Sequence, residues 1–64
     1  MNKIAEYVKK TRKMLGLTQA QLALYAFVST KFIIDLESGK TTLKMDKVLD
    51  VLHVLGATLE PVRE

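Results

Sequence analysis

Two helix starts within residues 18–39 constrain the fold of this 64-residue chain more than any other feature. Thr18 is followed three positions later by Gln21, the T-x-x-Q capping box in which the hydroxyl and the amide each satisfy a backbone N–H at the start of a helix. Ser29 provides a second N-cap eleven residues after the first. Two short helices must therefore fit into this stretch, and the link between them, residues 27–28, leaves room only for a sharp corner.

The apolar residues of this stretch repeat with helical period. Leu22 and Ala26 lie four apart, and the small residues of the first helix allow another helix to approach closely. In the second helix Ile33 and Leu36 lie three apart, and Gly39 supplies a stop. Two helices joined by such a corner form a helix-turn-helix unit, whose second helix can lie in the major groove of DNA.

The same residues resemble a known family. The motifs are L-G-L-T-Q-A-Q-L-A at 15–23, V-S at 28–29 and F-I-x-x-L-E-x-G-K at 32–40. They are similar to the helix-turn-helix domain of the lambda repressor/Cro (Xre) superfamily. The segment at 39–56, G-K-T-T-L-K-M-D-K-V-L-D-V-L-H-V-L-G, is most similar to the small HipB-type antitoxin regulators.

The resemblance covers Ile4 to Leu59 and implies a sequence-specific DNA-binding repressor. A HipB-like protein would repress its own operon from a palindromic operator and bind a HipA-type kinase toxin. The alternatives are a stand-alone phage-type repressor and a helical protein-interaction module without DNA binding. The expected fold is all-α, a small bundle of about four to five helices, with the DNA-binding domain at residues 1–56 and a C-terminal segment at 57–64.

A domain of this size buries only about 60% of the surface that its unfolded chain exposes, so its core is marginal. The chain has no cysteine for disulfides, and dimerisation is the remaining support. Ala57-Thr58-Leu59-Glu60 alternates apolar with polar, which predicts a short strand that pairs with the same segment of a second copy, as the resemblance to HipB-type proteins also implies. A frayed tail is the alternative.

The first helix is expected from Asn2 to just before Gly16, with its lysines outward and the following residues inward: Ile4, Val8 and Leu15. Arg12 falls on the inward stripe, where an unpaired charge is costly. Glu37 is the expected partner, and the resemblance implies the same pair. The alternative is an exposed arginine whose stem covers apolar surface.

A further helix is expected from Lys44 to Leu55, with a core stripe of Met45, Val48, Leu49, Leu52 and Leu55. Val51 and Val54 widen this stripe beyond the needs of one small domain, which indicates a second contact in the dimer. His53 shares the polar side with Asp46 and Asp50. We expect a solvated helix face there rather than a metal site, because no fourth ligand is in evidence.

The outward face of the second helix of the unit is predicted to meet DNA. Its residues lie at offsets of 0, 1, 4, 5 and 8: Thr30, Lys31, Ile34, Asp35 and Ser38. By resemblance Thr30, Lys31 and Asp35 read bases, and Ile34 is expected to touch a thymine methyl. Phosphate contacts are expected from Gln19, Ser29, Ser38, Lys40 and Thr41. The alternative is that these side chains are merely solvated.

Phe27 departs from the family pattern, which usually has Gly at this position of the turn. The turn favours a positive φ, in which a bulky residue is strained. Either the turn is a variant or another contact holds Phe27. An exposed Phe27 would also suit a protein partner.

Composition argues against other classes of function. The net charge of +3 is mild but compatible with a polyanion partner. Residues 14–28 carry no charge, yet this run is too short and too polar to span a membrane, and the basic N-terminus does not resemble a signal peptide, so we expect a cytoplasmic protein. Without cysteine, a glycine-rich phosphate loop or a second histidine, we expect neither catalysis nor a cofactor.

Overall fold

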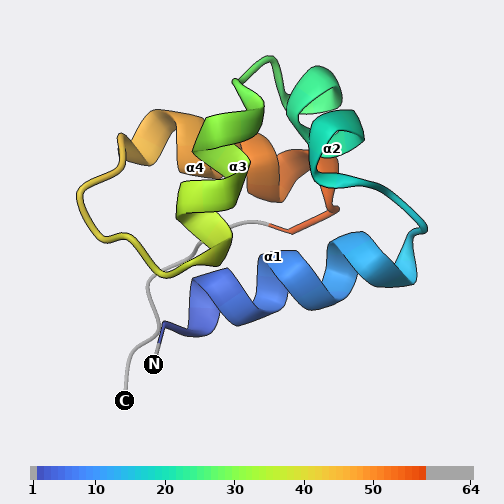
Figure 1. Cartoon of the computed structure of the whole chain (residues 1–64), viewed down its shortest axis with the longest axis horizontal. Helices are drawn as coiled ribbons and strands as arrows, with labels where there is room; N and C mark the ends of the chain where they lie inside the picture. Colours follow the sequence, from blue (N-terminus) through green and yellow to red (C-terminus); the bar gives the residue numbers. More distant parts are fainter. Residues whose placement is uncertain (1, 58–64) are drawn as a thin grey trace.

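The computed structural model describes residues 2–57, and within this range the chain forms four helices (Figure 1). Their bounds are α1 (Lys3–Met14), α2 (Gln19–Ala26), α3 (Thr30–Glu37) and α4 (Met45–Val54). The α2 helix packs against both α3 and α4, and α1 packs against α3. The all-α prediction is confirmed. Of the predicted C-terminal strand, only Ala57 lies within the described residues, where it packs partly buried against the core.

Side-chain caps set three of the four helix starts. Asn2 Oδ1 accepts from the backbone N–H of Ile4 at 2.9 Å. At α2 the predicted capping box is complete, since Gln21 N donates to Thr18 Oγ1 at 3.0 Å and Thr18 N donates to Gln21 Oε1 at 2.8 Å. Ser29 Oγ likewise caps α3. The start of α4 has no side-chain cap.

All four helices end with one backbone pattern. A residue with positive φ follows each helix, and the next residue donates its N–H to the carbonyl five positions earlier, at 2.8–3.1 Å. This is the Schellman motif, which satisfies carbonyls that a helix end leaves open. Glycine occupies the positive-φ position after α1, α3 and α4, whereas Phe27 occupies it after α2. Three short links can therefore turn sharply without leaving helix carbonyls unpaired.

The core lies where α2, α3 and α4 converge, with α1 covering one side. Its buried members are Val8, Leu22, Ala23, Ala26, Ile33, Leu36, Val48, Val51, Leu52 and Leu55. Most of the predicted inward positions are confirmed. Ala5, which the sequence analysis did not single out, is also buried.

Three residues that were predicted to be inward are exposed instead: Leu15, Met45 and Leu49. Leu15 follows the last turn of α1, where the chain already turns away from the core. Met45 is the first residue of α4, directly after the link from α3. Leu49 lies at the edge of the buried face, which is centred between Val48 and Val51.

Val51 corrects the prediction of a surplus apolar face on α4. The Val51 side chain is completely buried, and Val54 packs partly buried against the same core. The wide stripe of α4 therefore serves the core of a single chain, because α4 packs into the interior along α2. Val51 is not exposed for a contact between two copies.

Candidate nucleic-acid interface

A buried ion pair holds α3 against α1. Arg12 Nε donates to Glu37 Oε2 at 2.7 Å, and Arg12 Nη2 donates to Glu37 Oε1 at 3.1 Å. The Arg12 and Glu37 side chains are 10% and 4% exposed. Arg12 Nη1 also donates to the Leu17 carbonyl at 2.7 Å. The predicted pair is confirmed, with the two-point geometry that makes such pairs strong.

Gln19 extends this ion pair to α2. Its Nε2 donates to Glu37 Oε1 at 3.2 Å, a contact that the sequence analysis missed. The spacing of 18 residues between Gln19 and Glu37 carries no local signal of this contact. An amide nitrogen has two donor hydrogens, so one remains for the phosphate contact that was predicted for Gln19. Arg12, Gln19 and Glu37, which we call the inner network, connect three helices.

The opposite side of α3 faces outward with the predicted reading residues. Thr30, Lys31 and Ile34 are exposed, and Asp35 is partly exposed. On the inner side Ile33 and Leu36 are buried. The structure therefore gathers the four predicted base-reading side chains on one helix face, and their contacts with bases remain predictions.

Asp35 on this face has two cationic neighbours. Its Oδ2 lies 3.4 Å from Lys31 Nζ and 3.8 Å from Lys40 Nζ. The Asp35 side chain is 22% exposed, against 80% for Lys31 and 50% for Lys40. The i,i+4 spacing of Lys31 and Asp35 is a sequence signal for the first pair, which the analysis did not use. The second pair forms because the turn after α3 brings Lys40 close to Asp35.

The predicted phosphate contacts lie at the two ends of α3 and at the start of α2. Ser29 Oγ accepts from Phe32 N at 3.0 Å, so the Ser29 hydroxyl hydrogen stays available as a donor. Ser38 Oγ instead donates to the Asp35 carbonyl at 2.8 Å, and a phosphate contact by this hydroxyl would have to replace that bond. Lys40 and Thr41 are exposed in the loop after α3.

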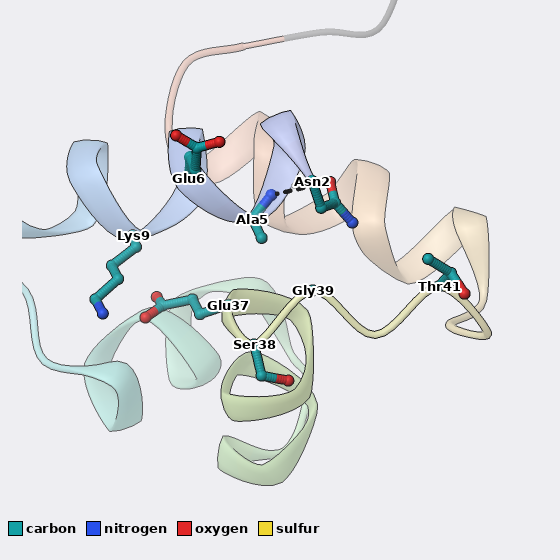
Figure 2. Close-up of a pocket in the computed structure, with 8 residues that line it drawn as sticks. All are labelled: Asn2, Ala5, Glu6, Lys9, Glu37, Ser38, Gly39 and Thr41. Carbon is teal, nitrogen blue, oxygen red and sulfur yellow. Dashed lines mark hydrogen bonds between the residues drawn. The ribbon is translucent and has the colours of Figure 1, made fainter.

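A groove lies behind the reading face, between the start of α1 and the end of α3 (Figure 2). It is lined by Asn2, Ala5, Glu6, Lys9, Glu37, Ser38, Gly39 and Thr41. Glu37 is already paired with Arg12, and the remaining charged groups of the lining, Glu6 and Lys9, are of opposite sign, so the charge favours neither an anionic nor a cationic ligand. Among residues 2–57 no cluster of three or more His, Cys, Asp or Glu could hold a metal ion.

Phe27 sits at the corner between α2 and α3 in the left-handed conformation, with φ 58° and ψ 40°. The turn therefore keeps the positive φ that the family pattern favours and is not a variant. The Phe27 side chain is 94% exposed, so no enclosing contact compensates for the strain. The turn is the same Schellman motif that ends the other helices, with Val28 N donating to Ala23 O at 3.0 Å. Leu24 and Tyr25 are exposed beside it on α2.

No helix within residues 2–57 has the length and hydrophobicity that spanning a bilayer requires.

The helix-turn-helix family model HTH_3 matches residues 8–62. The chain is also 44% identical over 57 residues to an uncharacterized HTH-type transcriptional regulator, y4mF, of Sinorhizobium fredii (strain NBRC 101917 / NGR234). That alignment covers 89% of this chain and 75% of the relative. With the corner at Phe27 and the outward face of α3, these matches show that the chain belongs to the HTH_3 family of helix-turn-helix proteins.

Proposed function

We propose that the chain is a sequence-specific DNA-binding regulator of transcription that reads the major groove with α3. The observation that carries this proposal is the two-sidedness of α3, whose inner face is fixed by packing and by the inner network while its outer face presents polar side chains to solvent. A reading helix needs both properties, because base contacts require side chains held in register on a rigid support. Family membership and the name of the Sinorhizobium relative, an HTH-type transcriptional regulator, support the same conclusion.

The roles of the reading residues follow from their hydrogen-bonding groups. Lys31 donates to guanine O6 and N7, and Asp35 accepts from cytosine N4. Thr30 can donate or accept, and Ile34 packs against a thymine methyl. Contacts to the phosphates then come from five residues: Gln19, Ser29, Ser38, Lys40 and Thr41.

We further propose that the regulator acts as a homodimer on a palindromic operator, with half-sites about one helical turn apart. Pairing of residues 57–60 across a two-fold axis would place two copies of α3 in successive major grooves. Val54 and Ala57 are partly buried at the base of this segment, whereas Thr58, Leu59 and Glu60 lie outside the described residues.

For the biological context we propose an antitoxin of the HipB type that represses its own operon and binds a HipA-type kinase toxin. The similarity of residues 39–56 to those regulators supports this proposal. A stand-alone phage-type repressor is the second candidate. Co-purification of the chain with a kinase encoded beside its gene would support the antitoxin, and a neighbouring kinase that is produced but not retained would contradict it.

A separate observation favours a protein-interaction role. The end of α2 exposes Leu24, Tyr25 and Phe27 together, at 73%, 57% and 94%, within a stretch that carries no charge. Apolar groups gathered in this way are typical of protein contacts. Such a surface suits either a partner of a DNA-bound regulator or a module that has no DNA affinity.

The Lys31→Ala variant tests DNA binding. Duplexes bound by the wild type are first selected from a random pool, and affinities are then measured by fluorescence anisotropy. We expect Lys31→Ala to lower the affinity for the selected duplex about tenfold for each protomer bound, because each protomer loses one base contact. The control is Lys47→Ala, an exposed lysine on α4, which should change the affinity little.

Salt adds a second measurement to the same experiment. If phosphates are neutralised, the affinity of the wild type should fall steeply between low and physiological ionic strength. A wild-type protein that selects no sequence, or whose binding is indifferent to salt, would contradict the DNA-binding proposal and leave the interaction module as the better explanation.

A further inference from the structure

Three charged side chains meet at the outward face of α3, and we call them the Asp35 cluster: Lys31, Asp35 and Lys40. Their formal charges sum to +1, since two lysines face one carboxylate. Both ammonium groups contact the same atom, Oδ2, at 3.4 and 3.8 Å.

The backbone makes this cluster a consequence of how α3 ends. Lys31 stands one turn before Asp35 on the same face. Beyond the helix, Lys40 N donates to the Asp35 carbonyl at 3.1 Å, and Gly39 has a φ of +92°, which lets the chain fold back. The side chain of Lys40 therefore leaves the backbone next to Asp35. The arrangement of the three charged groups is thus set by α3 and by the turn that follows it.

On a duplex the members of the Asp35 cluster have conflicting requirements. Lys31 and Lys40 gain most from guanine and from phosphate, and both contacts draw them away from Asp35. An unpaired carboxylate would then lie between two rows of phosphates, where like charges repel. In the major groove the only base groups that can donate to a carboxylate are the amino groups of cytosine N4 and adenine N6.

Resting on the proposed function, we propose that Asp35 is a selectivity residue that acts against wrong sequences. In the free protein Asp35 holds Lys31 and Lys40. Lys31 and Lys40 can leave Asp35 for DNA at little cost in free energy only where the duplex offers an amino group that donates to the Asp35 carboxylate. A duplex that offers none must either leave Asp35 unpaired or forgo both lysine contacts. Asp35 thereby lowers the affinity for nonspecific DNA more than it lowers the affinity for the operator.

The Asp35→Asn variant tests the proposal, because it removes the charge and keeps the shape. We expect its affinity for a scrambled duplex to rise about tenfold, and the ratio between selected and scrambled duplexes to fall by at least as much. The slope of log affinity against log salt on the scrambled duplex should steepen by about one per protomer, as one more positive charge is free. Repeating the selection with this variant should move the preferred base opposite residue 35 toward adenine, the partner of asparagine.

A matched variant separates the site from the net charge. Asp50→Asn makes the same change of charge at an exposed position of α4. We expect Asp50→Asn to leave both affinities unchanged within about twofold. If Asp50→Asn raises the affinity for scrambled DNA as much as Asp35→Asn does, net charge explains the effect and the proposal is overturned.

Two further outcomes keep the failure of this proposal apart from the failure of the proposed function. Circular dichroism of each variant confirms the fold, and Asp35→Ala replaces Asp35→Asn if the asparagine variant does not fold. A wild type that selects a sequence, with Asp35 variants that select the same sequence at the same ratio, overturns only the selectivity role. A wild type that selects no sequence overturns the DNA-binding function and this inference with it.

Discussion

The α3 helix carries two carboxylates two positions apart, and the protein places them in opposite environments. At about 100° per residue this spacing turns Glu37 inward when Asp35 faces outward. Glu37 is 4% exposed and receives two hydrogen bonds from Arg12, at 2.7 and 3.1 Å. The Asp35 side chain is 22% exposed, and its Oδ2 lies 3.4 Å from Lys31 Nζ and 3.8 Å from Lys40 Nζ. The same chemical group is therefore part of the support on one side and part of the reading surface on the other.

The difference teaches where stability comes from in this small domain. A buried pair is costly to break because the partner left behind is a desolvated charge. An exposed pair contributes little, because water and salt already screen both groups. The inner network should thus govern folding, and the outer face of the helix-turn-helix can vary in sequence with little effect on the fold. Phe27, which is strained and exposed at the corner between α2 and α3, likewise lies outside the inner network.

The strongest test of this contrast is Glu37→Ala. We expect the free energy of unfolding to fall by about 3–5 kcal/mol, because Arg12 remains buried without its partner. For a domain of this size such a loss approaches the whole stability, so urea unfolding should begin near zero denaturant. Replacing Arg12 and Glu37 together by Met and Leu should recover most of the loss. The control is Glu6→Ala, at an exposed glutamate on α1. An equal loss of stability in Glu37→Ala and Glu6→Ala would contradict the difference between the buried and the exposed carboxylate.

Phe27→Gly should have an intermediate effect of opposite sign. Glycine adopts a positive φ without strain, so we expect the free energy of unfolding to rise by about 1 kcal/mol. Thermal unfolding measures this change. Leu24→Ala, which removes a largely exposed apolar side chain from a residue with helical φ, should alter the midpoint little. A midpoint that falls in Phe27→Gly would mean that the ring stabilises the turn through contacts, against its exposure.

The smallest expected change in stability is that of Asp35→Asn. Since both lysines are exposed and Asp35 is partly exposed, we expect a loss below about 1 kcal/mol in the free energy of unfolding, measured by urea unfolding. The same variant is expected to change DNA selectivity clearly, so stability and binding should separate at Asp35 and move together at Glu37. A loss comparable with that of Glu37→Ala would show that the Asp35 cluster supports the fold, and the two sides of α3 would no longer differ in kind.

Much of the framework could be read from local sequence. Thr18, Gln21 and Ser29 predicted two helix starts correctly because capping depends only on groups three residues apart. The Arg12 to Glu37 pair was found because a charge on an apolar stripe needs a partner, although 25 residues separate the two. The sequence also marked Phe27 as unusual in a turn that favours a positive φ. Phe27 adopts this φ, and its ring is exposed rather than held by another contact.

Other features of the molecule could not be found in this way. The buried face of α4 includes Val51 and leaves Leu49 exposed, because the rotation of a helix about its axis is set by the shape of the helices beside it. The contact of Gln19 with Glu37 depends on the angle between α2 and α3, which neither helix encodes alone.

By itself, the sequence determined the helix boundaries, the corner at residues 27–28 and the polar outer face of α3, since caps, turns and periodicity act over a few neighbouring residues. Only the tertiary structure decided that Gln19 of α2 joins the Arg12–Glu37 pair and that Lys40 returns beside Asp35. The physical reason is that contacts between residues far apart in the sequence depend on the angles at which the helices pack and on the path of the turn after α3, and no local pattern encodes either of them.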